Sequence, residues 1–347
     1  MNYTQSDVAE FLNISKAAIS KWEKGRSIPE VVYIIQLSKL FNTTIDELVN
    51  SSVKHTKEEI KRLYHFYSRR FSTEPFDATV DEVDEYARKH FNDYSLLLQF
   101  SVLLMNHHQL KPQSKVVQDN AVKYISRIIK HSDSLFEKEQ ATFLLASIYL
   151  QLGQNDSVIE LLEDTRLPKL PANIVLSLSY LQNDDRTQAN QTLQAEVYQN
   201  VIFMINSLTV MIQHQLHSNS DQLIDRGLKI AETFDLNNLH PNSIMNFYLA
   251  SAINKRDDLH SCIDYLKRFN KIVKNMMENY YLHGDEFFDE IDDWIKDFDL
   301  GNNAPLNIDT FRRQVLVQVM SNPQFEHIKD TIEFKNIIHD LSNIVGE

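Results

Sequence analysis

The fold of the N-terminal part is decided by the stretch Thr4-Gln5-Ser6-Asp7-Val8-Ala9-Glu10-Phe11-Leu12-Asn13-Ile14-Ser15-Lys16-Ala17-Ala18-Ile19-Ser20-Lys21-Trp22-Glu23-Lys24-Gly25. Thr4 is a favourable N-cap residue, and apolar residues follow it at helical spacing. Asn13 suits a tight turn, Ser15 can cap a second helix, and Gly25 suits the positive φ that commonly ends a helix. The stretch therefore predicts two short helices joined by a turn, with small and basic residues on the outer face of the second.

Two further helices are expected before the sequence becomes polar. Pro29 suits the first position of a third helix, and Thr44 can cap a short fourth one. The third helix carries apolar residues that we expect to be buried, namely Val32, Ile35, Leu37, Leu40 and Phe41. Residues 51–57 are polar and lack periodicity, as is typical of a linker. We therefore expect a small domain over residues 1–50, a linker over 51–57 and a second region over 58–347.

The second region is expected to be helical as well. Thr56 with Glu59, and Thr79 with Glu82, match the capping-box pattern of helix starts. Residues 285–299 carry eight acidic residues beside an apolar stripe, which predicts an amphipathic helix with an acidic face. The chain has six glycines, too few for a β fold with many tight turns. The expected fold class is all-α.

Motifs for catalysis and cofactor binding are missing from the sequence. No two glycines lie closer than 17 positions, which excludes the G-x-G-x-x-G fingerprint and the Walker loop. The 13 histidines form no H-E-x-x-H motif, and the single cysteine, Cys262, excludes zinc-finger spacings. No G-x-S-x-G motif of a serine hydrolase occurs. We therefore expect no enzyme activity, no cofactor and no metal site.

Composition and charge indicate where the chain works. No apolar run approaches the roughly 20 residues that span a bilayer, and the first residues lack an export signal. These features favour the cytoplasm and no membrane partner. The net charge of −13 is uneven, because residues 1–70 carry 11 basic and 8 acidic residues (net +3) while residues 71–347 have a net charge of −16. Since salt screens charges beyond about 10 Å, the N-terminal segment can still contact phosphates.

The order of cap, alanine, turn, apolar and glycine positions over roughly residues 3–50 resembles the phage-repressor-like (Cro/C1, XRE) helix-turn-helix family. In that family the second helix enters the major groove of DNA. The resemblance implies base contacts by Lys16, Ala17, Ser20 and Lys21, since lysine donates to guanine and an alanine methyl contacts the thymine methyl. It implies phosphate contacts by Thr4, Gln5, Lys24 and Arg26. Ser15 is also a candidate DNA contact, although capping suits it better.

The first helix of that family has no counterpart here, because the chain offers only Met1-Asn2-Tyr3 before the Thr-Gln pair. We expect Val8, Phe11 and Ile35 to be partly exposed as a result, at a cost on the order of several kcal/mol at about 25 cal/mol per Å². A start lying upstream, a truncation, or a segment or second chain that covers the gap would each explain this. The first two explanations are favoured.

The second region holds a weak internal repeat. Tyr149, Tyr180 and Ile253 are each followed at +9 and +13 by small or apolar residues. The pattern resembles tetratricopeptide repeats, which are stacked helix pairs with a concave inner face. The first two copies lie 31 residues apart instead of 34, so a generic α-solenoid or an irregular bundle is the alternative.

A helix-turn-helix followed by helical repeats resembles the Rgg/PlcR/PrgX type of bacterial regulator, which senses short signalling peptides in quorum sensing. In those proteins carboxamide side chains grip an extended peptide, because Asn and Gln match both the donor and the acceptor of a peptide amide. If the repeat alignment holds, the residues lining such a groove are Gln140, Phe143, Ser147, Gln151, Asn206, Gln213, Phe247, Ser251 and Asn254. The alternative for each is an ordinary polar or apolar surface position.

The resulting hypothesis is a transcription regulator that binds a double-stranded DNA operator as a homodimer and is controlled by a peptide or another ligand. Two modest half-sites need a dimer to reach useful affinity. One alternative is a helical-repeat protein-interaction module with a vestigial DNA-binding domain. Another is a phage-type repressor that needs no ligand.

Overall fold

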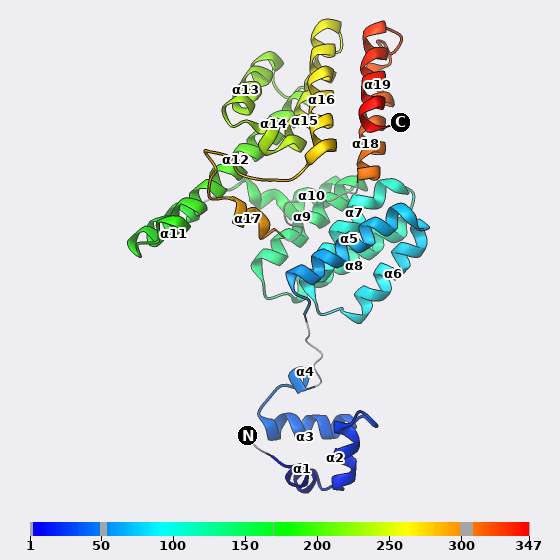
Figure 1. Cartoon of the computed structure of the whole chain (residues 1–347), viewed down its shortest axis with the longest axis vertical. Helices are drawn as coiled ribbons and strands as arrows, with labels where there is room; N and C mark the ends of the chain where they lie inside the picture. Colours follow the sequence, from blue (N-terminus) through cyan, green and yellow to red (C-terminus); the bar gives the residue numbers. More distant parts are fainter. Residues whose placement is uncertain (1–2, 49–53, 169, 299–307, 347) are drawn as a thin grey trace.

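The computed structural model describes residues 3–48, 54–168, 170–298 and 308–346, and all regular structure in these ranges is helical (Figure 1). This confirms the expected all-α class. None of the described helices is both long and apolar enough to cross a membrane. The α-helices are α1 (Gln5–Leu12), α2 (Lys16–Glu23), α3 (Val31–Phe41), α4 (Ile45–Leu48), α5 (Lys57–Thr73), α6 (Phe76–Lys89), α7 (Tyr94–His107), α8 (Lys115–His131), α9 (Leu135–Gln151), α10 (Asn155–Leu162), α11 (Ala172–Gln182), α12 (Arg186–Gln213), α13 (Ser220–Thr233), α14 (Leu236–Leu239), α15 (Pro241–Asn254), α16 (Leu259–Asn279), α17 (Asp292–Lys296), α18 (Ile308–Met320) and α19 (Ile332–Val345). Short 3₁₀ helices are η1 (His108–Leu110), η2 (Glu163–Arg166) and η3 (Pro323–Phe325).

Helices α1–α4 form a small unit with a core of its own, made of Val8, Ala9, Leu12, Ile19 and Leu37. The third helix begins at Val31, two residues later than Pro29 suggested. Several of its apolar residues are less buried than expected. Val32 is 51% exposed, Ile35 39% and Phe41 36%. Val32 and Ile35 share a side of α3 that no element of the described chain covers.

Helices α5–α9 surround a second core, whose fully buried members include Tyr64, Phe100 and Tyr124. Helix α5 begins as expected, since Thr56 and Glu59 form a capping box. The capping box expected at Thr79 and Glu82 is wrong. Thr79 lies inside α6 and its hydroxyl donates to the carbonyl of Pro75, the N-cap residue of that helix.

Helices α12, α13, α15, α16, α18 and α19 surround the third and largest core. Residues 285–298, which pack on α12, are not the amphipathic helix that the sequence suggested. They are helical only over α17. Hydrogen bonds with α12 hold the preceding loop: the Gln191 side chain donates to the carbonyl of Glu290, and the Gln194 side chain accepts from its N–H. The apolar stripe is nevertheless buried, since Phe288, Ile291 and Ile295 pack on Tyr198.

The weak repeat corresponds to three helix pairs. Tyr149, Tyr180 and Ile253 lie on α9, α11 and α15, and the residues at +9 and +13 lie on α10, α12 and α16, against which those helices pack. The paired helices range from 8 to 28 residues, and α13 and α14 intervene before the third pair. The arrangement is therefore a series of helix pairs of unequal length.

Candidate nucleic-acid interface

The helix-turn-helix geometry is built by local capping. The Thr4 hydroxyl accepts from the N–H of Asp7, and the Asp7 carboxylate accepts from the N–H of Thr4 at 2.8 Å. The backbone hydrogen bond from Thr4 lowers the pKa of Asp7. Asn13 adopts the left-handed conformation (φ 54°), which few residues other than Gly and Asn tolerate. Asn13 and Ile14 form the turn between the two helices, and Ser15 then caps α2 by accepting from the N–H of Ala18 at 3.3 Å.

The inner face of α2 fixes the orientation of its outer face. Ile19 is buried in the core, and the ring of Trp22 packs on that of Tyr33 with the centroids 5.5 Å apart. Gly25 ends the helix at φ +63°, where a side chain would be strained. Ile19 and Trp22 therefore face the interior of the unit, as expected, and the opposite face of α2 is open.

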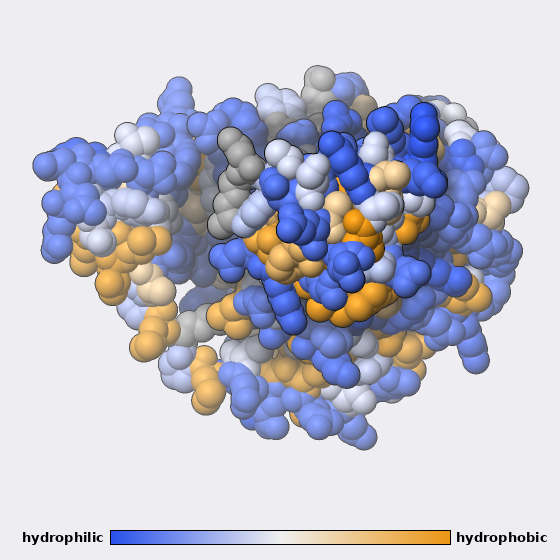
Figure 2. Space-filling model, turned by 90° about the horizontal axis from the view of Figure 1, so that it is seen from below, coloured by the Kyte–Doolittle hydropathy of each residue, from blue (hydrophilic) through white to orange (hydrophobic). Residues whose placement is uncertain are grey.

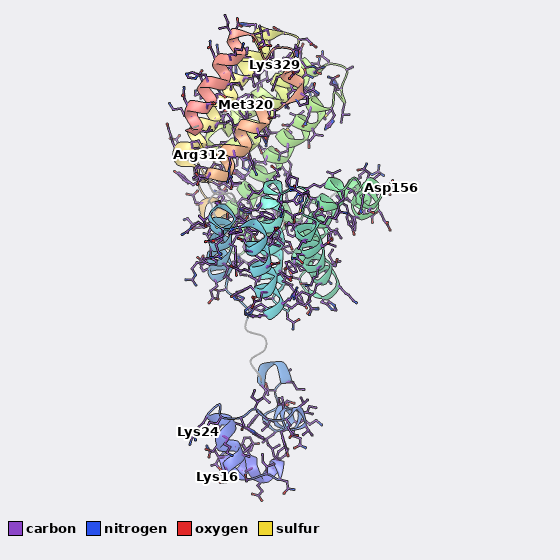
Figure 3. The ribbon with its side chains drawn as sticks, turned by 90° about the vertical axis from the view of Figure 1, so that its right-hand side faces the viewer. Lys16, Lys24, Asp156, Arg312, Met320 and Lys329 are labelled. Atoms are coloured by element: carbon purple, nitrogen blue, oxygen red, sulfur yellow. The ribbon has the colours of Figure 1, made fainter. Side chains whose placement is uncertain are left out.

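The open face carries the residues that the sequence assigned to DNA. Lys16, Ala17 and Lys21 are exposed, and Ser20 is half-buried. Lys24 and Arg26 are exposed just beyond the helix, and Figure 3 shows Lys16 and Lys24 on the same outer side of the unit. None of the four cations forms an ion pair or a side-chain hydrogen bond with another described residue. Residues 16–26 thus present four unpaired positive charges, with Glu23 as the one acid in that stretch.

Thr4 and Gln5 lie at the N-terminus of α1, as expected for phosphate contacts, but the Gln5 side chain is engaged. Its amide donates to the carboxylate of Glu23 across the two helices. This hydrogen bond explains why Glu23 is present on a face that is otherwise basic, since it ties the end of α2 to the start of α1. A carboxamide has two N–H groups, so Gln5 retains one for a phosphate oxygen.

Comparisons of the sequence with known proteins agree with a helix-turn-helix at the N-terminal end. Residues 1–48 match the helix-turn-helix family. The chain is also similar to the HTH-type transcriptional activator BcrR of Enterococcus faecalis, with 38% identity over 71 residues. That alignment covers 19% of this chain and 35% of BcrR, so the chain spans about a third of the length of the curated relative it matches. No solved structure matches the chain significantly.

The expected exposure of the N-terminal apolar face is seen at Phe11, which is 53% exposed, and at Ile35. Val8 departs from the expectation because it is 8% exposed and packs in the core with Leu12 and Leu37. Figure 2, which views the molecule from the side of this unit, shows apolar surface here among polar residues. The packing of α1, α2 and α3 therefore protects one apolar face of α1 and leaves a second uncovered.

The residues expected to line a ligand groove do not form one continuous surface. Phe143 and Gln151 on α9, and Asn206 and Gln213 on α12, are exposed, while Ser147 is half-buried and donates to the carbonyl of Phe143. Phe247 and Ser251 are fully buried and lie in the core instead of on an open surface. The Asn254 amide donates to the Ser220 hydroxyl at 3.3 Å, so this side chain joins α15 to α13.

Gln140 lines a cavity of about 730 Å³. Of the residues that line this cavity, only Gln140 had been assigned to a ligand groove from the sequence. Phe136 and Gln140 of α9 line it together with Gln199 and Phe203 of α12, and neither glutamine has a hydrogen-bond partner among the described residues. Tyr198 of α12 also lines the cavity, as do His240, Trp294 and Phe298 from segments further along the chain. Burial lowers the pKa of His240 to about 4, so its ring is neutral at pH 7.

The cavity reaches the start of the helical region. Lys57, the first residue of α5, lines it, and the Lys57 ammonium donates to the carbonyl of Asp297 at 3.3 Å. Two residues earlier, His55 is held by Asp93, whose carboxylate accepts from the His55 N–H at 2.7 Å, and by the hydroxyl of Tyr86. The segment that leads toward the helix-turn-helix is thus attached to the body beside the cavity.

Proposed function

We propose that this chain is a sequence-specific DNA-binding transcription regulator. The observation that carries the proposal is the open face of α2, on which Lys16, Ala17 and Lys21 are exposed around a helix oriented by Ile19 and Trp22. Small residues let the helix approach the groove, and unpaired lysines lose no internal contact on binding. The similarity of residues 1–48 to helix-turn-helix domains, and of a short segment to a transcriptional activator, supports the same function.

In this proposal the residues divide into two groups. Lys16, Ala17, Ser20 and Lys21 contact base edges in the major groove. Thr4, Gln5, Ser15, Lys24 and Arg26 contact the phosphates that flank them, with the α1 N-terminus adding backbone N–H donors. The acidic body keeps DNA on the side of the basic face. Two copies read two half-sites, because one short helix offers few base contacts.

The experiment begins with selection of duplexes from a random library by the full chain, because the operator is unknown. Binding of a selected duplex is then measured by fluorescence anisotropy for the wild type, K16A/K21A and the control K39A, which removes an exposed lysine of α3. We expect K16A/K21A to lose sequence preference, and K39A to retain it. Equal binding by K16A/K21A and the wild type, or no enrichment in the selection, would favour the protein-interaction alternative.

We propose further that a ligand, such as a peptide, controls the regulator from the cavity between α9 and α12. Gln140 and Gln199 are free to bind both groups of an amide, and Phe136 and Phe203, each about 60% exposed, offer apolar contact. A cavity of this size, mostly apolar with a few polar groups, is typical of ligand sites. Because Lys57 and Asp297 belong to its wall, a ligand would act where the connection to the DNA-binding unit begins.

Trp294 provides the readout for this second proposal, since it lines the cavity and Trp22 is the other tryptophan of the chain. A library of short apolar peptides is titrated against the wild type and against Q140A/Q199A. A fluorescence change that is lost in Trp294→Phe and weakened at least tenfold in Q140A/Q199A supports peptide control. A regulator that binds DNA but responds to no peptide supports the ligand-independent repressor.

A further inference from the structure

Helix α11 exposes most of its apolar residues. Its main packing partner is α12, and Ser177 is the one residue of α11 that is classed as buried. Beside it, Ile174 is 51% exposed, Val175 66% and Leu178 53%, and Leu170 just before the helix is 88% exposed. Figure 2 shows the resulting apolar patch on the projection at the left, which is the place of α11 in Figure 1.

These residues share one side of the helix. Leu178 lies four positions after Ile174 and three after Val175, so the three side chains project from one side of the helix and form a stripe. The opposite side faces α12, where the Ser177 hydroxyl donates to the carbonyl of Ala189 at 3.0 Å and the Asn173 amide donates to Glu196. We call Leu170, Ile174, Val175 and Leu178 the α11 stripe. It points away from α12, so no described helix shields it.

The α11 stripe lies in an uncharged segment of an acidic chain. Residues 170–183 contain no Asp, Glu, Lys or Arg, although 24% of the whole chain is charged. Charges of both signs flank it, with the Glu163–Arg166 ion pair before the segment and Asp184, Asp185 and Arg186 after it. The segment is therefore an uncharged apolar surface between two charged ones.

We propose that the α11 stripe is the surface through which two copies of this chain associate, with their α11 helices antiparallel about a two-fold axis. The bodies repel each other through their net charge of −16, so close approach is favoured where charge is absent. A two-fold contact uses the same surface on both copies and closes after two. The inference assigns a surface to the homodimer of the proposed function, and it rests on that part of the proposed function.

The apolar area of the α11 segment can be compared with the area that specific protein–protein interfaces bury. With the partly exposed Leu176 and Leu181, the segment presents on the order of 500 Å² of apolar surface per copy, a size at which patches on monomers are often functional. Two copies would bury about 1,000 Å², the lower limit of specific interfaces. We therefore expect a weak dimer in the absence of DNA, which adds a second connection between the copies.

Sedimentation equilibrium of the full chain, up to about 100 μM so that the expected dimer is well populated, tests the surface. V175E/L178E places two carboxylates in the contact, and we expect its dissociation constant to rise at least tenfold. The matched control is V317E, which changes a valine of α18 that is 60% exposed, and we expect it to dimerise like the wild type. Because all these positions are exposed, circular dichroism should show unchanged helix content. A monomeric wild type, or equal dimerisation of V175E/L178E, overturns the proposal.

DNA separates this inference from the proposed function: V175E/L178E should still bind a duplex with one half-site and lose cooperativity on two. Failure of the wild type on every duplex would count against DNA binding and leave the sedimentation result unaffected.

Discussion

Substitution of Gly227 by alanine tests whether α13 and α15 pack as closely as the structure indicates. A Cβ atom at Gly227 would lie 2.3 Å from Cε2 and from Cζ of Phe247. Carbon atoms in contact are normally about 3.5–4.0 Å apart, so the two helices would have to separate by more than 1 Å or the ring would have to move. Phe247 is fully buried within the largest core, so its ring can move only if its neighbours in that core also move.

Two effects of opposite sign decide the result. Alanine stabilises a helix interior by about 1 kcal/mol relative to glycine. Overpacking of a buried site costs about 1–3 kcal/mol and more when backbone must shift, and a 2.3 Å contact belongs at the upper end of that range. We therefore expect Gly227→Ala to lower the free energy of unfolding by about 2 kcal/mol.

Urea unfolding followed by circular dichroism measures the change. Phe247→Leu removes the ring atoms that clash, so G227A/F247L should be less destabilised than the sum of the two single variants. Gly153→Ala provides a comparison, because its Cβ meets no atom within 4 Å and its cost comes from φ +70° alone. A stabilised G227A would refute the reasoning. It would mean that the Phe247 ring has open space beside it. That is the situation expected if Phe247 lined a ligand groove, as the sequence had predicted.

Three further predictions concern single groups. Burial lowers the pKa of His240 from 6.5 to about 4, so the neutral ring contributes to stability above pH 6.5. The free energy of unfolding falls by at most about 3 kcal/mol as the pH drops from 6.5 toward 4. The urea midpoint of His240→Gln should depend less on pH over this range than that of the wild type. Thr4→Ala removes the cap of α1, which should destabilise that helix by about 1 kcal/mol. Hydrogen exchange of the α1 amides should then be about fivefold faster. Unchanged exchange would show that the cap does not stabilise the helix. Burial raises the pKa of the Cys262 thiol to about 12, so iodoacetamide should not label it below the urea transition, and labelling of the native chain would contradict its burial.

The sequence predicted the N-terminal unit well because its signals are local. Capping by Thr4 and Ser15, the left-handed turn at Asn13 and the helix end at Gly25 each depend on a few neighbouring residues. The burial of α3 was predicted less well. Apolar spacing identifies a helix face, but another element must cover that face before Val32 and Ile35 are buried.

The body shows the limits of periodicity more clearly. Residues 285–298 have a helical apolar stripe, yet hydrogen bonds from α12 hold much of the segment outside a helix. Phe247 and Ser251 share a face with Asn254, but that face packs on α12 and α13 instead of lining a groove. The cavity could not be predicted because its walls come from segments that lie up to about 240 residues apart, as in the contact of Lys57 with Asp297. Gln140 was assigned to a groove by the repeat alignment, and it lines the cavity together with residues that the alignment did not bring to it.

The most direct test of the account is the salt dependence of DNA binding by the wild type and by K24A/R26A, measured on one selected duplex. Each phosphate contact contributes about 0.9 to the slope of log K against log salt concentration. The account predicts sequence-selective, salt-dependent binding by the wild type, and a slope that is smaller by about 2 per bound copy in K24A/R26A with sequence preference retained. An affinity of the wild type that is independent of salt, or the same slope in both proteins, would contradict the assignment of this basic face to DNA.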